Sequence, residues 1–281
     1  MTCAWQPLLN IMPPLLRADV DRFGRDELLE LRLRIGMQPE MVMQDGSKYL
    51  SGLVTQDVLQ FVINAACRYS PWTATTSADG YITTRGGHRI GLCGEVTLRN
   101  GTMADVKRIT SLCIRVARDF PGIGKRAAMT GSLLILGRPS SGKTTLLRDL
   151  IRIRSDGGEG SVAVVDERGE LFPSYQGAAC FPPGRRTDIL SGCPKREGIS
   201  LLLRTMGPAT IAVDEITAQE DCAAVLQALW CGVDLLATAH AGSVADFMLR
   251  PVYKPLIESK VFTTALVMQP DKNWREEQLT I

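Results

Sequence analysis

The residues with the clearest chemical meaning form a glycine-rich loop in the middle of the chain. Residues 137–144 read Gly-Arg-Pro-Ser-Ser-Gly-Lys-Thr and match G-x-x-x-x-G-K-[ST] at every fixed position. The apolar run 133–136 precedes the loop and apolar residues at helical spacing follow it, as phosphate binding between a strand and a helix requires. The pattern predicts a site for the phosphates of a nucleotide.

The positions of this loop have distinct expected roles. Backbone N–H groups of the loop and of the following helix would surround the phosphates. Lys143 would contact the β- and γ-phosphates, and the Thr144 hydroxyl would complete the coordination of Mg²⁺. The alternative is a chance glycine-rich turn. The predicted nucleotide-binding residues are Gly137, Arg138, Pro139, Ser140, Ser141, Gly142, Lys143, Thr144 and Thr145.

A second motif supplies two adjacent carboxylates. Residues 210–215 read Thr-Ile-Ala-Val-Asp-Glu, an apolar strand that ends in an acidic pair, which is the form of a Walker B element. Asp214 would hold Mg²⁺ through water, and Glu215 would polarise the attacking water as a general base. An apolar run before Asp-Glu is common by itself. Its position after a complete phosphate-binding loop favours the functional interpretation.

Three more side chains are candidates for the same site. Residues 164–170 read Val-Val-Asp-Glu-Arg-Gly-Glu, and carboxylates at the carboxyl edge of a parallel sheet point toward the ligand, so Glu167 or Glu170 could orient water. The alternative is a solvated loop in which Arg168 forms a surface ion pair. His240 follows a later apolar run, where a sensor of the γ-phosphate would lie, and a structural histidine is its alternative.

Positive charge for the transferred phosphate can come from a neighbouring subunit. Arg186 and Arg204 are the first candidates and Arg185 is the next, although each is also consistent with a surface or structural arginine. The other histidine, His88, follows Gly86-Gly87 and is expected to be a turn residue.

The elements that position these residues fall into two regions. The second region alternates short apolar runs with helical patterns, which predicts a parallel sheet covered on both faces. Its expected strands are residues 133–136, 162–165, 211–213, 235–237 and 265–268. The first region predicts strands at 26–33, 41–43, 81–84, 89–98 and 108–116, and a helix after Thr55. A break at 120–124 places the boundary near residues 119 to 130, and the expected domains are 1–125 and 126–281.

Composition limits the possible functions. The 281 residues are 45% apolar and 22% charged, with a net charge of +2, so the chain has no global attraction to nucleic acid or anionic lipid. No two of the eight cysteines have the C-x-x-C spacing, which favours buried free thiols. Without a signal peptide, the chain is expected to stay in a reducing cytoplasm. Neither a signal peptide nor a spanning apolar run is present, so we expect any membrane contact to be indirect.

Two nucleotide-binding families fit poorly. GTPases read guanine with an Asn-Lys-x-Asp-type element, and no such string occurs. ABC ATPases are a closer rival, because Leu190-Ser191-Gly192 precedes Asp214 and His240 could act as their switch histidine. However, Cys193-Pro194 replaces the Gly-Gln of their signature, and too few residues separate Lys143 from Ser191 for their helical subdomain.

Longer strings point to another family. They are Leu31 to Arg34, Gly80 to Thr84, Gly86 to Gly91, Ile114 to Arg118, Val165 to Arg168, Arg186 to Leu190, Gly192-Cys193-Pro194-Lys195, Leu203 to Met206 and Val213 to Ile216. Together they resemble the stage III sporulation protein AA family, ATPases of endospore-forming bacteria that are distantly similar to type II and type IV secretion ATPases. The chain departs from the family at Arg138-Pro139, where two prolines are usual, and at Thr217-Ala218, where a Gly-Arg-like pair is usual.

The resemblance implies an α/β fold: a RecA-like P-loop domain with a parallel sheet, preceded by a smaller α+β domain like that of secretion ATPases. It implies ATP and Mg²⁺ as cofactors and a homo-oligomer, a hexameric ring. The ring would lie on the cytoplasmic side of the mother cell's inner membrane, at the channel to the forespore. A membrane protein such as stage III sporulation protein AB would hold it there, with no stable nucleic-acid partner.

Three functions are compatible with these features. The leading one is a motor that hydrolyses ATP to drive assembly of, or transport through, an envelope channel. The second is a structural subunit whose ring assembly depends on nucleotide binding without turnover. The third is a nucleic-acid motor that uses the basic residues of the first domain. These are Arg85, Arg89, Arg99, Lys107, Arg108, Arg115 and Arg118, with few aromatic residues between them.

Overall fold

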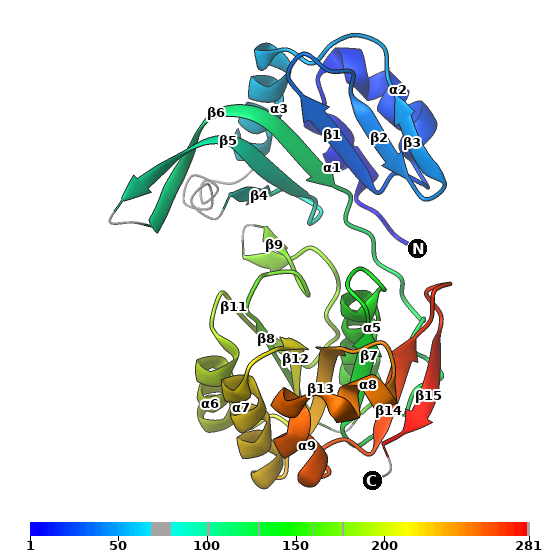
Figure 1. The fold of residues 1–281 in the computed structure, drawn as a ribbon, viewed down its shortest axis with the longest axis vertical. Helices are drawn as coiled ribbons and strands as arrows, with labels where there is room; N and C mark the ends of the chain where they lie inside the picture. The colour runs from blue at the N-terminus through cyan, green and yellow to red at the C-terminus, as the bar shows by residue number, and fades with distance from the viewer. Residues whose placement is uncertain (69–79, 100–101, 129, 159, 176, 280–281) are drawn as a thin grey trace. The chain divides into compact units, whose positions relative to one another are not determined.

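The chain folds into two compact units, seen in a computed structural model (Figure 1). The structure describes residues 1–68, 80–99, 102–128, 130–158, 160–175 and 177–279. The first unit consists of Met1–Asp119 and the short segment Pro173–Phe181, and the second of Phe120–Phe172 and Pro182–Ile281. The division falls at Asp119, and one segment from within the expected second domain belongs to the first unit.

The second unit is built on a sheet in which the described strands have the order β11-β8-β12-β13-β7-β14-β15. All neighbours pair in parallel except β15, which is antiparallel to β14. The five expected strands are present, and β11 and β15 are additional edge strands. The bounds are β7 (Leu133–Gly137), β8 (Val162–Asp166), β11 (Thr187–Ser191), β12 (Thr210–Ile216), β13 (Asp234–His240), β14 (Thr264–Met268) and β15 (Trp274–Gln278).

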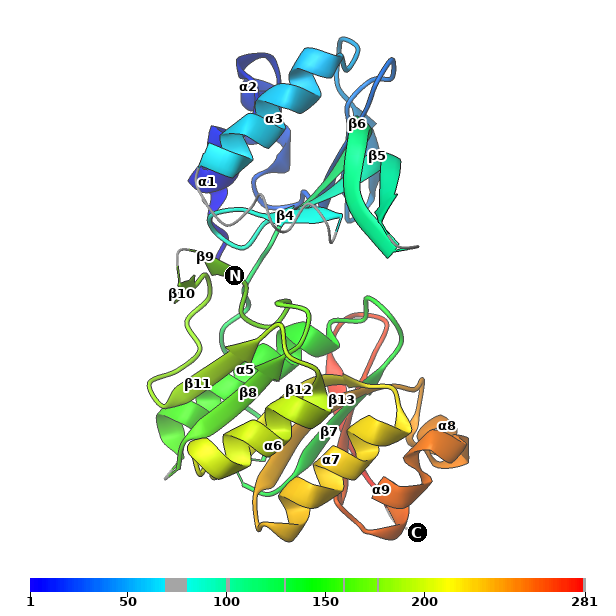
Figure 2. The ribbon, with the colours of Figure 1, turned by 90° about the vertical axis from the view of Figure 1, so that its left-hand side faces the viewer.

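Helices cover both faces of this sheet, which explains why its central strands are continuous apolar runs. Helix α5 (Lys143–Gly157) lies on one face, and α6 (Lys195–Thr205) and α7 (Gln219–Trp230) lie on the other (Figure 2). Leu134 of β7 and Val213 of β12 belong to one core cluster with Val225 of α7. The short helices α8 (Val244–Leu249), η2 (Pro251–Tyr253) and α9 (Lys254–Glu258) follow β13.

The first unit is an antiparallel sheet with helices on one face (Figure 2). Its described strands have the order β3-β2-β1-β6-β5-β4. Val58 N–H donates to Thr55 Oγ1 at 3.4 Å, so Thr55 caps the expected helix. The bounds are α1 (Trp5–Asn10), α2 (Pro14–Gly24), β1 (Glu30–Arg34), β2 (Glu40–Met43), β3 (Gly46–Tyr49), α3 (Gln56–Arg68), β4 (Tyr81–Thr83), β5 (Arg89–Arg99) and β6 (Thr102–Arg115).

The segment Pro173–Phe181 contains a small hairpin, β9 (Ser174–Tyr175) and β10 (Ala178–Ala179). Phe181 is buried, and the side chains of Cys180 and Phe181 lie within van der Waals distance of where a Cβ on Gly87 would stand. Gly87 has a φ of 81°, which a residue with a side chain rarely adopts. The chain therefore leaves the second unit after β8, contributes to the first, and returns before β11.

Together these units form an α/β fold with a parallel sheet, preceded by a smaller α+β unit, as the sequence predicts. In the ranges that the structure describes, no helix is both long enough and apolar enough to cross a bilayer. The eight cysteines are free thiols, but the expectation that they are buried is correct only for Cys222, because Cys93 and Cys231 are exposed and the other five are half-buried.

Candidate functional site

The glycine-rich loop connects β7 to α5 and has the backbone shape of an anion-binding loop. Ser140 and Gly142 are left-handed, with φ values of 60° and 101°. A Cβ on Gly137 would lie 2.4 Å from Ser141 Oγ, so the loop requires glycine there. Gly142 precedes α5 and has no side chain to cap it, so the first N–H groups of the helix can bind an anion.

Two polar side chains of the loop fit a phosphate ligand. Ser141 Oγ is buried and has no hydrogen-bond partner in the described part of the chain. Lys143 is 4% exposed, and its Nζ donates to the backbone oxygen of Arg138 at 2.9 Å. Burial lowers the pKa of Lys143, while Asp214 and Glu215 oppose that shift. A buried ammonium and an unpaired hydroxyl beside open backbone N–H groups suit the phosphates of a nucleotide.

Asp214 lies at the carboxyl end of β12 and contacts the loop directly. Thr144 Oγ1 donates to Asp214 Oδ2 at 2.7 Å, and Thr238 Oγ1 donates to Asp214 Oδ1 at 2.6 Å. Burial raises the pKa of Asp214, and the two hydroxyl groups oppose that shift. A threonine hydroxyl and a carboxylate next to a phosphate site are the hard oxygen donors that Mg²⁺ takes. The residues fit the predicted metal pair.

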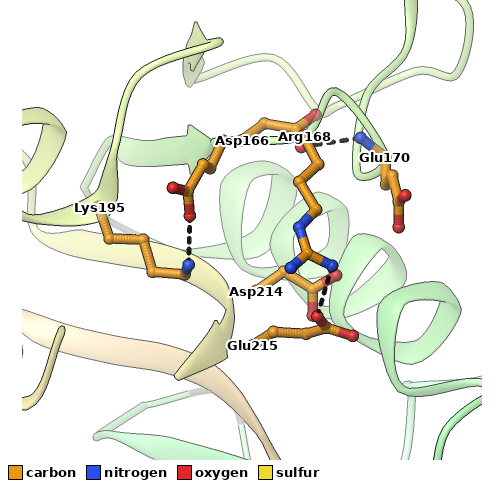
Figure 3. A pocket seen from close by; sticks show the side chains of 7 residues that line it. Asp166, Arg168, Glu170, Lys195, Asp214 and Glu215 are labelled. Atoms are coloured by element: carbon orange, nitrogen blue, oxygen red, sulfur yellow. Dashed lines mark hydrogen bonds and ion pairs between the residues drawn. The ribbon is translucent and has the colours of Figure 1, made fainter. Parts of the chain in front are cut away.

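An irregularity in β12 brings Glu215 to the same site. Neighbouring residues of a regular strand point to opposite faces of the sheet. The register between β12 and β13 shifts between Val213 and Ile216, and Glu215 has a φ of 53°. Its N–H donates to Thr238 Oγ1 at 2.8 Å. The side chains of Asp214 and Glu215 therefore line one pocket (Figure 3).

His240 connects the loop lysine to Glu215. Its Nδ1 lies 3.2 Å from Lys143 Nζ, and its Nε2 lies 3.1 Å from Glu215 Oε1. An ammonium only donates, so Nδ1 accepts and Nε2 carries the proton that it donates to Glu215. The other oxygen of Glu215 lies 3.0 Å from Arg168 Nη1. A continuous chain of hydrogen bonds thus runs from Lys143, the expected phosphate ligand, to Glu215, the expected general base.

The loop after β8 is shaped by Asp166. This carboxylate is 2% exposed and accepts the N–H groups of Glu170 at 2.9 Å, Leu171 at 3.2 Å and Phe172 at 2.8 Å. Burial raises the pKa of Asp166, and the three backbone hydrogen bonds oppose that shift. Asp166 is therefore occupied in holding the loop that carries Glu167 and Glu170.

The strand ends meet at one small acidic pocket. It combines the end of β8, the end of β12 and the first residue of α6, and Glu167 in it bonds to Lys195. The expected candidates Glu167, Glu170 and Glu215 all line this pocket, and Figure 3 shows Glu170 and Glu215 in it. The pocket is lined by Asp166, Glu167, Arg168, Glu170, Lys195, Asp214 and Glu215.

The structure does not bring Arg186 or Arg204 to the site of their own chain. Arg186 lies at the opposite end of α5 from Lys143, where its N–H donates to Ser155 Oγ at 2.8 Å and its Nε to the Ser155 oxygen at 3.0 Å. Arg204 is exposed in the last turn of α6, and its Nε donates to the Ser200 oxygen at 3.2 Å. A role toward a neighbouring subunit stays a prediction for both.

The sequence assigns no role to Thr238 or Lys195, although both contact residues of the site. Thr238 bonds to both residues of the acidic pair, and Lys195 bonds to Glu167. Thr238 stands in the same short string as His240, and Lys195 ends the string Gly-Cys-Pro-Lys. Both residues therefore lie in strings that the sequence analysis singled out, but only the fold shows which atoms their side chains contact.

Comparison with known proteins decides the family. Residues 9–278 match the family described as "Sporulation stage III, protein AA". The chain belongs to this family. It is 37% identical over 257 residues to stage III sporulation protein AA of Bacillus subtilis (strain 168), a match that covers 88% of this chain and 84% of that protein. The resemblance inferred from the motifs is confirmed.

The fold of this chain is similar to that of two ATPases of known structure. The ATPase DotB of Legionella pneumophila matches with a TM-score of 0.53 at 17% identity, over 89% of this chain and 75% of that chain. The pilus retraction motor PilT, solved with bound ADP, matches with a TM-score of 0.61 at 14% identity, over 89% and 76% of the two chains. The predicted RecA-like, secretion-ATPase fold is confirmed.

Proposed function

We propose that this member of the stage III sporulation protein AA family is a Mg²⁺-dependent ATPase that works as a motor of the channel between mother cell and forespore. The observation that carries the proposal is the hydrogen-bonded chain from Lys143 through His240 to Glu215. A phosphate that binds Lys143 would take over the hydrogen bond that this lysine donates to His240. The change at His240 would then affect Glu215, the residue placed to activate water. A nucleotide scaffold has no need of that connection.

Each side chain has a task in this proposal. Lys143 and the loop N–H groups bind the phosphates, with the Ser141 hydroxyl as a further donor. Thr144 and Asp214 hold Mg²⁺, which when bound neutralises charge that develops on the phosphates. Glu215 accepts a hydrogen bond from the attacking water, and His240 keeps the Glu215 carboxylate oriented. Glu167 or Glu170, in the same pocket, gives that water a second acceptor.

The assembly is part of the same proposal. We expect a homo-oligomeric ring, a hexamer, in which Arg186 or Arg204 meets the nucleotide of a neighbouring subunit. The ring lies on the cytoplasmic side of the mother cell's inner membrane and contacts it through a membrane protein such as stage III sporulation protein AB. Family membership and the fold shared with PilT and DotB support this arrangement.

The nucleic-acid alternative has less support because several of the basic residues of the first unit have partners. Arg108 lies 3.5 Å from Glu95, and Arg115 lies 3.5 Å from Glu30. Arg118 donates to the backbone oxygen atoms of Gly24, Arg25 and Leu28. Charges satisfied within the unit contribute less to binding a phosphate backbone.

The variant Glu215→Gln tests the proposal. The amide keeps the size of the side chain and can still accept from His240, but it does not act as a base. We expect Mg²⁺-ATP binding and oligomer formation to stay as in the wild type, and phosphate release to fall by about 10² or more. Undiminished phosphate release would contradict the role of Glu215. An inactive variant that still supports spore formation would favour the structural subunit instead.

A further inference from the structure

Lys195 stands where a lysine is ordinarily unfavourable. It is the first residue of α6, next to the positive end of the helix dipole, and it is only 8% exposed. Burying an ammonium group costs free energy unless the charge is paired. The surroundings of Lys195 must therefore supply compensating negative charge.

Two carboxylates from different elements supply that charge. Lys195 Nζ bonds to Oε2 of Glu167, the first residue after β8, and it lies 3.9 Å from Asp221 Oδ2 in the first turn of α7. Asp221 in turn accepts the N–H groups of Thr217 at 2.9 Å and Ala218 at 3.1 Å, directly after β12. The ammonium thus links the two strand ends that carry the acidic motifs.

Lys195 also lines a cavity about the size of one water molecule. The pocket at these strand ends has a volume of about 20 Å³, enough for one water molecule but for little more. Five of its seven lining residues are acidic. Each of the two cations in the lining pairs with a different glutamate. Arg168 pairs with Glu215 (Figure 3). Lys195 pairs with Glu167.

We propose that Lys195 is a positioning residue for ATP hydrolysis that acts through Glu167; this inference rests on the proposed function. The Glu167 side chain is 37% exposed and has room to turn toward solvent. Its bond to the buried ammonium holds one carboxylate oxygen and leaves the other to accept a hydrogen bond from water in the cavity. The ammonium of Lys195 also places a positive charge among the carboxylates that line the pocket, which offsets part of their mutual repulsion.

The test compares Lys195→Met, Lys195→Arg, Glu167→Gln and the double variant Lys195→Met/Glu167→Gln in the full chain. The matched control is Lys254→Met, because Lys254 is an exposed lysine of α9 that pairs with Glu258 on the same helix. The measurements are kcat and KM for Mg²⁺-ATP, with thermal unfolding recorded for every variant.

We expect Lys195→Met to lower kcat by about tenfold to a hundredfold, the scale of a misplaced catalytic group, with KM nearly unchanged. Lys195→Arg should recover part of the loss because a guanidinium also pairs with a carboxylate. The double variant should be no slower than Glu167→Gln alone. The control should turn over like the wild type.

Other outcomes overturn the inference in distinguishable ways. If the wild type is active and Lys195→Met retains its kcat, Lys195 has no role in turnover. If the losses of the two single variants multiply in the double variant, Lys195 does not act through Glu167. If only the unfolding temperature changes, the ion pair is structural. A wild type without turnover refutes the proposed function, and this inference with it.

Discussion

The hydroxyl group of Thr238 links the two acidic residues of β12. It donates to Asp214 Oδ1 at 2.6 Å and accepts the N–H of Glu215 at 2.8 Å. Thr238 is fully buried, so water cannot replace it in either bond. One side chain on β13 therefore orients the expected Mg²⁺ ligand and fixes the backbone of the expected base. Outer partners of metal ligands commonly act in this way.

The variant Thr238→Val tests this residue. Valine keeps the shape of threonine but leaves Asp214 Oδ1 and the Glu215 N–H without their partner. We expect the Mg²⁺ concentration for half-maximal ATP hydrolysis to rise at least about tenfold, measured by titrating Mg²⁺ at saturating ATP. Thr238→Ser keeps the hydroxyl and should behave like the wild type. An unchanged Mg²⁺ requirement in Thr238→Val would exclude the orienting role.

The sequence predicts site residues well where their spacing is local. Lys143 and Thr144 follow from one contiguous motif, and Asp214 with Glu215 from another. The structure brings both motifs together because β12 and β7 flank β13 in one parallel sheet. The hydrogen bonds of Thr238 could not be predicted, because they depend on the shifted register between β12 and β13.

Among the elements, predictability follows burial. Strands β7 and β8 are buried along their whole length, so a continuous apolar run marks them. Edge strand β11 has the sequence Thr-Asp-Ile-Leu-Ser and is held by its pairing with β8. This sequence has neither a continuous apolar run nor a strict alternation of apolar and polar residues, so it does not predict a strand. Helices α1 and α2 are short, and prolines precede and begin α2, so the apolar pattern there is interrupted.

A buried histidine follows the turn between β4 and β5. His88 was expected to be a turn residue; it follows the turn, with its Nε2 bonded to the Ala4 oxygen at 2.9 Å and its Nδ1 accepting the Ala117 N–H at 3.1 Å. These two bonds require the neutral ring with the proton on Nε2. Burial lowers the pKa of His88 from 6.5 to about 4, and the charge of Arg118 adds to the shift.

We therefore expect the free energy of unfolding of the first unit to decrease at acidic pH. Between pH 6.5 and about 4 the unfolded chain binds a proton at His88 that the folded unit does not. The contribution of His88 to the free energy of unfolding is fully present above pH 6.5. It decreases by up to about 3 kcal/mol as the pH falls to about 4. Peptide-resolved hydrogen exchange in β4 and β5 should show this loss in the wild type. His88→Gln, which does not titrate, should show a smaller pH dependence, and equal pH dependences would refute the assignment.

At the scale of the whole molecule, the chain passes between its two units more often than a simple pair of domains requires. Pro173–Phe181 belongs to the first unit, yet both of its neighbours in sequence belong to the second. The segment begins directly after Phe172, whose N–H donates to Asp166 at 2.8 Å in the loop that carries Glu167 and Glu170. Composition and periodicity do not predict such an exchange, because a nine-residue segment is shorter than the window they need.

The proposed function requires that ATP is hydrolysed at the Lys143 site in an assembly of several chains. The most direct test is Mg²⁺-dependent phosphate release per subunit over a wide range of protein concentration, with Lys143→Ala as the control for contaminating activity. We predict turnover that rises with concentration to a plateau and is absent in Lys143→Ala. Turnover that is independent of concentration would refute completion by a neighbouring subunit. No release above the Lys143→Ala background at any concentration would contradict the proposed function itself.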